Sequence, residues 1–173
     1  MWLLADDRVR ARVERRQYRA LVKHVFVPRK SGWVANRPDG EAAGAALWYP
    51  PGTKEHNFRE SMAESLPFLP AGIPHLGKAS RLQNLITSNW PKEEHWYLSV
   101  LSVSPESQGK GYGSALLQPG LDAADRDGIG CWLETQRKSN LPFYSQFGFQ
   151  LLRKLEVEPG VPLWLMWRPP PTG

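Results

Sequence analysis

The hydrophobic and polar positions divide the chain into a helical N-terminal part, a hairpin and a second helical region. Residues 8–25 contain no glycine or proline and follow two aspartates that can act as N-caps, which predicts a helix. Two short apolar runs, residues 31–36 and 42–49, flank a turn rich in proline and glycine, which predicts a β-hairpin. Residues 53–89 have helical spacing broken by prolines, so we expect two helices joined by an elbow.

The second half begins with the most strand-like segment, residues 95–103, which is apolar and aromatic on both faces. Such a run is typical of a strand in the middle of a sheet that is covered on both sides. The later elements are expected as a helix over about 111–126, a strand at 131–135, a helix at 140–146, and strands at 149–156 and 163–167. This order predicts one α/β domain over residues 1–173, with a basic helical segment at 1–30 and a proline-rich tail at 169–173.

The basic character of the chain is local. The formal net charge is +5, and residues 1–30 hold 9 Lys or Arg and 3 Asp or Glu, so the remainder is nearly neutral. Placed on a helix, one face carries Arg8, Arg12, Arg15, Arg16, Arg19 and Lys23, and the far side carries Ala11, Tyr18, Leu21, Val22 and Val25. We interpret the cations as a solvated face and expect the far side to be buried, and contact of the cations with an anionic substrate, the coenzyme or a partner is the alternative. A regulator that binds nucleic acid through this helix is a further alternative, but no nucleic-acid-binding motif accompanies it.

Cysteine usage and hydropathy limit the cellular compartments in which this protein is expected. Cys131 is the only cysteine, which excludes a disulfide within the chain and matches no metal-ligand spacing, so no metal site is expected. No apolar run has the length of a membrane span, and no secretory leader is visible at the start. We therefore expect an unprocessed cytoplasmic protein without a membrane partner.

A glycine-rich turn follows the central strand. Gly109, Gly111 and Gly113 occur where residues 95–103 end and the next helix begins. A helix N-terminus offers unpaired amides and the positive end of its dipole, and glycines let the backbone approach an anion closely. The turn is neither a P-loop nor a dinucleotide fingerprint, because both spacings are absent. It therefore predicts a phosphate-binding site of another kind.

The turn fits the pattern Gln/Arg-x-x-Gly-x-Gly/Ala through Gln108, Gly111 and Gly113. This pattern resembles the acetyl-coenzyme A signature of the GNAT superfamily of N-acetyltransferases, and residues 140–149 resemble the later helix of that family. Shorter runs, such as residues 96–98 and 133–135, are similar to the puromycin N-acetyltransferase group. The resemblance implies the GNAT fold, a central mixed twisted sheet with helices on both faces.

One departure concerns the N-terminus. The first edge strand and most of the first helix of the family have no counterpart here. Either the chain is this short, which would leave residues 31–36 as an exposed edge that a partner or a second copy could cover, or it begins at an internal methionine. The sequence leaves both alternatives open.

The resemblance also implies acetyl-coenzyme A as co-substrate and a set of binding residues. The backbone of Leu101, Ser102 and Val103 would pair with the pantetheine arm. The pyrophosphate would lie on the segment that contains Gln108, Gly109, Lys110, Gly111, Tyr112, Gly113 and Ser114. Asn140 and Phe143 would contact the coenzyme from the later helix.

Two residues are predicted to carry the chemistry. Tyr144 is the candidate general acid, because a phenol can donate a proton to a departing thiolate. Glu134 is the best candidate for the general base, with Glu94 and His95 behind it and a water chain as a further alternative. Cys131 is expected to be a buried small apolar residue rather than a nucleophile.

The acceptor is less well defined. The aromatic residues that flank the expected acceptor pocket are Trp48, Tyr49, Trp90, Trp96 and Tyr97, although each alone could equally be core. The resemblance favours a small-molecule primary amine, an aminonucleoside or antibiotic-like compound, and thus a role in antibiotic resistance. A protein or peptide N-acetyltransferase and a non-catalytic acyl-coenzyme A sensor remain the alternatives.

Overall fold

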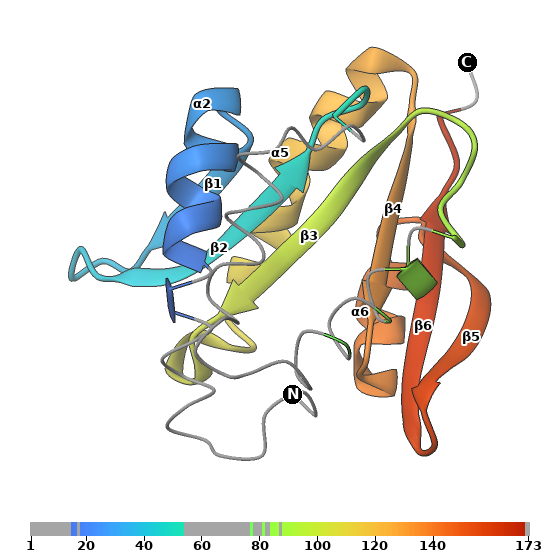
Figure 1. The fold of residues 1–173 in the computed structure, drawn as a ribbon. Coiled ribbons are helices and arrows are strands. Elements are labelled where there is room, and N and C mark those ends of the chain that lie inside the picture. The colour runs from blue at the N-terminus through green and yellow to red at the C-terminus, as the bar shows by residue number, and fades with distance from the viewer. Residues whose placement is uncertain are drawn as a thin grey trace.

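The computed structural model describes residues 15–16, 18–53, 77, 81, 84–86 and 88–171. Their centre is a six-stranded mixed sheet in the order β1-β2-β3-β4-β6-β5. The N-terminal helix covers one face of the sheet and α5 covers the other (Figure 1). The α/β class and the helices on both faces agree with the expected fold.

The strands have the bounds β1 Gly32–Asn36, β2 Ala42–Tyr49, β3 His95–Val103, β4 Gly130–Thr135, β5 Gln150–Glu158 and β6 Val161–Arg168. Only β3 and β4 pair in parallel, and every other neighbouring pair is antiparallel. The hairpin, the central strand and the alternation of the second half are therefore confirmed. Among the described residues β1 forms one edge of the sheet and β5 the other.

The second half contains one long helix and several short ones. Their bounds are η3 Pro105–Ser107, α5 Tyr112–Asp127, η4 Lys138–Asn140 and α6 Leu141–Ser145. Gly128, with φ 67°, ends α5 in the left-handed conformation that glycine adopts at little cost. No helix of the described segments is both long and apolar enough to cross a membrane.

The N-terminal helix extends further than the sequence predicts. A π-helical turn η1 (Val22–Phe26) leads into α2 (Val27–Arg29), and the helix stops at Lys30, whose φ is 51°. The wider π turn lets the chain pass Pro28, which would otherwise clash with a helical carbonyl. Residues 8–14 of the predicted helix lie outside the described residues, as do most of the two helices expected between residues 53 and 89.

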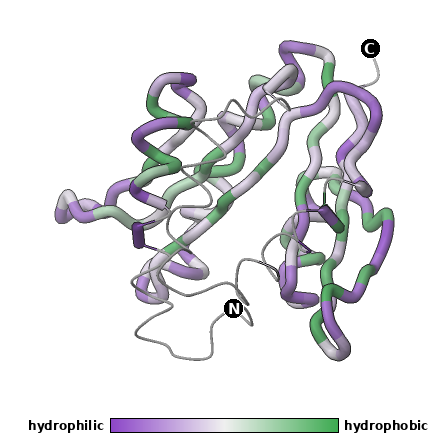
Figure 2. Tube along the Cα trace, viewed as in Figure 1, coloured by the Kyte–Doolittle hydropathy of each residue, from purple (hydrophilic) through white to green (hydrophobic). Residues whose placement is uncertain are grey.

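The buried face of the N-terminal helix is narrower than expected. Leu21, Val25 and Phe26 are buried against Leu47 and Tyr49 of β2. Tyr18 and Val22 keep 43% and 38% of their surface exposed, so their predicted burial is wrong. The helix contacts the sheet along a single row of side chains, which leaves these two at its border. Figure 2 shows that hydrophobic and hydrophilic residues alternate along this helix.

The main core lies between α5 and the other face of the sheet. Trp48 of β2, Leu133 of β4 and Met166 of β6 are fully buried there against Leu117 of α5. Gly120 faces Trp48 so closely that a Cβ atom would lie 2.3 Å from the indole Cε2. A residue without a side chain is therefore required at this crossing of helix and strand.

We predict that Gly120→Ala lowers the free energy of unfolding by about 1–3 kcal/mol, the usual effect of overpacking a core. We expect this loss of stability even though alanine stabilises a helix interior by roughly 1 kcal/mol relative to glycine. Urea unfolding measures it, with Gln118→Ala, an exposed position on α5, as the control for helix propensity. A Gly120→Ala protein as stable as the Gln118→Ala protein would contradict the packing described.

Candidate functional site

Strands β3 and β4 pair over only part of their length. The parallel register runs from His95 with Gly130 to Leu98 with Leu133. Beyond it, the pairing of β3 with β2 slips, because Trp48 opposes Leu98 while Leu47 opposes Val100. Ser99 is the extra residue of this bulge, and a bulge bends a strand. The C-terminal ends of β3 and β4 therefore diverge, as Figure 1 shows.

The glycine-rich turn lies at the end of β3. Gly109 and Gly111 have φ values of 73° and 84°, a region that residues with a side chain rarely adopt. Gly111 is the N-cap of α5 and provides no side-chain hydrogen bond, so the first amides of this 16-residue helix have no side-chain cap. The turn thus has the geometry of the anion-binding site that its sequence predicts.

A pocket of about 680 Å³ joins the divergent strands, the turn and α6. It brings together eleven of the predicted residues: Leu101, Ser102, Val103, Gln108, Gly109, Gly111, Gly113, Ser114, Asn140, Phe143 and Tyr144. Lys110, Tyr112 and the predicted base Glu134 do not line it. Ser107 and Arg137 line it and were not anticipated. Arg137 could have been noticed as a cation between the two family-like motifs, whereas nothing in the sequence distinguishes Ser107.

Helix α6 is held close to α5 at this pocket. A Cβ atom on Gly113 would lie 3.4 Å from Cζ of Phe143, so the second glycine of the motif permits the approach. The side-chain amide of Asn140 donates a hydrogen bond of 3.1 Å to Oγ1 of Thr135, which fixes its orientation at the end of β4. Phe143 of α6 is therefore positioned by packing, and Asn140 of η4 by one hydrogen bond.

Tyr144 is buried between Phe143 and Phe149, with 7% of its surface exposed. Burial, and then the negative charge of Glu134, raise the pKa of Tyr144 to about 12. Its hydroxyl therefore stays protonated throughout the physiological range. The electrostatic effect of Glu134 also shows that the two predicted catalytic residues lie within reach of each other's charge.

Glu134 lies on β4 and accepts a hydrogen bond at Oε1 from the hydroxyl of Tyr97. Its other oxygen, Oε2, is buried and has no hydrogen-bond partner among the described residues. Burial raises the pKa of Glu134 to about 7, and the hydroxyl of Tyr97 and then the indole of Trp132 oppose part of that rise. A carboxyl group that is partly ionised near neutral pH can act as a base there.

The two other candidate bases differ from Glu134. Glu94 is exposed. His95 is buried with 4% exposure, and its Nδ1 lies 2.8 Å from the carbonyl oxygen of Glu93. Glu134 is kept as the candidate base, because its Oε2 atom is buried and its Oε1 atom accepts a hydrogen bond from Tyr97.

Cys131 is fully buried, as expected, and burial raises the pKa of its thiol to about 12. A thiol that stays protonated is a poor nucleophile. Among the described residues no group of His, Cys, Asp and Glu side chains could hold a metal ion.

The five aromatic residues expected at the acceptor pocket lie on two faces of the sheet. Tyr49, Trp90 and Tyr97 form one group, with ring centroids 5.7 Å apart for Tyr49 and Tyr97 and 5.4 Å apart for Trp90 and Tyr97. Trp48 and Trp96 instead belong to the core beside α5, so they are not candidates for an acceptor wall. Successive residues of a strand point to opposite faces, which separates each of these tryptophans from its neighbouring tyrosine.

The comparisons with known proteins agree with this architecture. The model of the Acetyltransferase (GNAT) family matches residues 2–149. An uncharacterized N-acetyltransferase of Schizosaccharomyces pombe is 29% identical over 145 residues, which cover 77% of this chain and 59% of the relative. The chain thus matches less than two thirds of that relative's length.

Two solved structures share the fold. A histone acetyltransferase HPA2 and related acetyltransferase from Corynebacterium glutamicum superposes with a TM-score of 0.67 at 24% identity, over 99% of this chain and 81% of the other. A nourseothricin acetyltransferase gives a TM-score of 0.52 at 19% identity, over 81% and 65%. With a family match over most of its length and the divergent strands and glycine turn in place, the chain belongs to the Acetyltransferase (GNAT) family.

Proposed function

We propose that the protein is an acetyl-coenzyme A-dependent N-acetyltransferase that transfers the acetyl group directly to a primary amine in a ternary complex. The observation that carries this proposal is the single pocket that joins the glycine-rich turn, the N-terminus of α5, the free end of β3 and Tyr144. Its volume of about 680 Å³ is that of a small-molecule site.

The described residues fit the parts of the donor. The pyrophosphate would lie over the turn, where a Cβ atom on Gly109 or Gly111 would meet nothing within 4 Å and the backbone is open to an anion. Arg137 adds a cation to the same pocket, and Lys110 lies within the turn. The exposed edge of β3 from Leu101 to Val103 offers backbone groups to the pantetheine amides.

The chemistry divides between two side chains. The N–C bond forms as the C–S bond of the thioester breaks, and the amine must lose a proton while the thiolate gains one. Glu134, ionised in part at pH 7, would take the amine proton directly or through water. Tyr144, protonated because of its raised pKa, would donate to the thiolate and recover its proton from solvent.

The acceptor is proposed to be a small aromatic or hydrophobic amine, such as an aminonucleoside or an antibiotic-like compound. The group of Tyr49, Trp90 and Tyr97 next to Glu134 supports this class, because aromatic rings bind flat apolar groups and also attract an ammonium ion. A role in antibiotic resistance would follow from such an acceptor. A protein or peptide N-terminus is the alternative acceptor.

Coenzyme binding is the first test, measured as the increase in melting temperature with acetyl-coenzyme A. Arg137→Gln should reduce that increase, because it removes a cation that lines the pocket. Lys138→Gln is the matched control, since Lys138 is the next residue, is exposed and does not line the pocket. Equal increases in the wild type and both variants would contradict the position assigned to the coenzyme.

Thiol release with a panel of amines then separates the alternatives. The panel contains aromatic amines, an aminonucleoside, aminoglycoside-type amines and short peptides. Faster release with the small aromatic amines supports the proposed acceptor, and faster release with peptides would replace it. Binding of acetyl-coenzyme A without release for any amine would identify a sensor module instead of an enzyme.

A further inference from the structure

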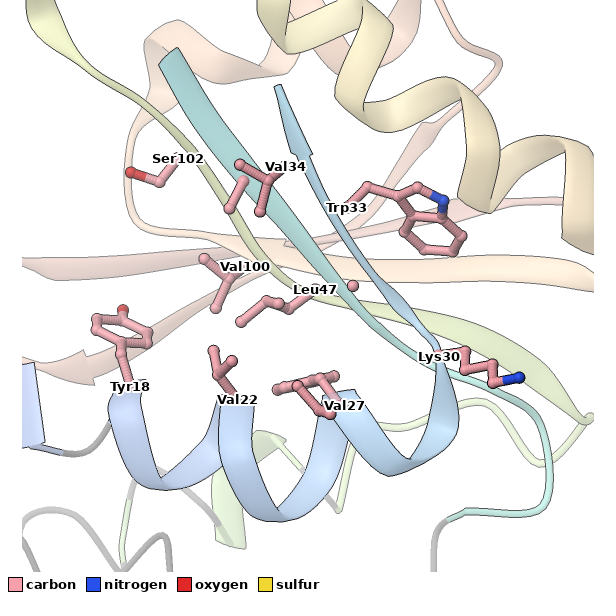
Figure 3. A pocket seen from close by; sticks show the side chains of 12 residues that line it. Tyr18, Val22, Val27, Lys30, Trp33, Val34, Leu47, Val100 and Ser102 are labelled. Atoms are coloured by element: carbon pink, nitrogen blue, oxygen red, sulfur yellow. The ribbon is translucent and has the colours of Figure 1, made fainter. Parts of the chain in front are cut away.

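A second, mostly apolar pocket adjoins the candidate active site, and Ser102 of β3 lines both. It has a volume of about 520 Å³ and lies between the N-terminal helix and the edge of the sheet formed by β1, β2 and β3. Figure 3 shows Val22 and Val27 of the helix on one side, and Val34, Leu47 and Val100 of the strands on the other. Apart from Ser102, no residue assigned to the proposed transfer reaction lines this pocket.

Several apolar residues at the border of this pocket are unusually exposed. Val34 and Val27 keep 65% and 64% of their surface exposed, and Tyr18 and Val22 at the same pocket keep 43% and 38%. Single exposed apolar residues are ordinary, but four around one hollow form a contiguous patch. Such a patch is typical of a surface that binds another molecule.

Strand β1 contributes a further feature. It pairs with β2 on one side, and among the described residues it has no strand on its other side. An outermost strand presents backbone N–H and C=O groups in the spacing that another extended chain can match. The exposed side chain of Val34 lies in the middle of this strand.

The charged residues that line this pocket and the hollow beside it, among those that the structure describes, are all positive. Residues 15–36 contain six Lys or Arg and no Asp or Glu. Arg15, Arg19 and Lys23 line an adjoining hollow of about 500 Å³ that shares Tyr18, Val22 and Val27 with the apolar pocket. None of these three cations forms an ion pair with another described residue. The patch therefore complements a ligand that is both apolar and acidic.

We propose that this surface, defined by β1, the apolar pocket and the cations of the N-terminal helix, binds an extended acidic and apolar segment of a partner protein. The segment would add to β1 as a further strand, place apolar side chains in the pocket, and bring carboxylates to Arg15, Arg19 and Lys23. A second copy of this chain fits less well, because its own basic patch would face the first. An anionic membrane fits less well too, since the apolar residues line a hollow instead of protruding.

The test measures binding of a fluorescein-labelled peptide of about eight residues, composed of valine and glutamate, the length of a short strand. The peptide should bind the wild-type protein with an affinity that weakens as salt concentration increases. Val34→Glu and Lys23→Glu should each raise the dissociation constant at least about tenfold, because they place a negative charge against the acidic peptide. Leu152→Glu is the matched control, since Leu152 is 56% exposed on β5 at the opposite edge.

Three further arms decide between the occupants. A valine and lysine peptide of the same length should not bind, and N-methylation of alternate residues in the acidic peptide should abolish binding because strand pairing needs those N–H groups. The proposal is overturned if the acidic peptide does not bind, if the lysine peptide or the methylated peptide binds equally well, or if Leu152→Glu weakens binding as much as Val34→Glu. It is also overturned if only phosphatidylserine vesicles bind, or if the wild type is a dimer that Val34→Glu dissociates.

Discussion

Glu134→Gln is expected to lower turnover by about 100-fold at pH 7, a usual loss when a general base is removed. The side chain keeps its shape and can still accept a hydrogen bond from Tyr97, but it can no longer take a proton from the acceptor amine. Steady-state rates of thiol release at saturating acetyl-coenzyme A measure the effect. A variant with wild-type turnover would exclude Glu134 as the base.

The pH profile gives a second signature of the same residue. Because burial raises the pKa of Glu134 to about 7, the wild-type rate should increase as the pH rises through 7 and then level off. Glu134→Gln should lack this step and recover part of its activity at high pH, where more of the amine is unprotonated. Tyr97→Phe should move the step to higher pH, since the hydrogen bond from Tyr97 lowers the pKa of the carboxyl group. Glu94→Gln, at an exposed position, should leave the profile unchanged.

The stability of Glu134→Gln against urea shows whether this variant has lost its catalytic group or its folded structure. A carboxyl group whose pKa is higher in the folded than in the unfolded state stabilises the fold at low pH, and this contribution is lost as the pH rises from about 4.5 through about 7. Above that range the buried charge costs up to about 3 kcal/mol. Glu134→Gln avoids this cost, so at pH 8 it should unfold at higher urea concentration than the wild type. A marked loss of stability at pH 8 would show that the carboxylate has a structural role instead.

Tyr144→Phe is expected to lower turnover by about 100-fold while the dissociation constant of acetyl-coenzyme A stays within about twofold, as for the loss of a general acid. The hydroxyl is the only group removed, and the ring can keep its contacts with Phe143 and Phe149. The step at about pH 7 should remain, because it belongs to Glu134. Turnover and coenzyme affinity are measured separately, by thiol release and by calorimetry.

Phe143→Leu supplies the control for packing at the same helix. Phe143 lines the pocket and touches Gly113, so this variant should weaken coenzyme binding more than it lowers turnover. Tyr144→Phe should show the opposite pattern. If Tyr144→Phe weakens coenzyme binding and leaves turnover unaltered, the hydroxyl acts in binding and another group donates the proton.

Local patterns in the sequence predicted most of the second half of the fold. The apolar run of β3, the glycine turn and the periodicity of α5 are each set by neighbouring residues, and so β3, β4, α5, α6, β5 and β6 were expected close to their observed bounds. Eleven of the predicted residues line one pocket, because its backbone segments carry a recognisable motif, and their roles in binding the coenzyme stay a prediction. Burial of Cys131 was also expected from its place at the start of a strand.

Other features depend on contacts between segments that are distant in sequence. The sequence left Glu134 as one of three candidate bases. Its pKa near 7 arises because the folded chain excludes water from its carboxyl group, an effect that the hydrogen bond from Tyr97 on β3 partly opposes. Ser107 and Arg137 likewise enter the pocket through the path of the loops, which no local pattern predicts.

By itself, the sequence determined the order of the elements, the glycine turn and the membership in a family, because these depend on neighbouring residues and on a short motif. The tertiary structure decided which faces the aromatic residues occupy, how much of the N-terminal helix is buried, and which carboxyl group is removed from water. Burial and electrostatic energy are sums over contacts between distant segments, so they exist only once the chain has folded.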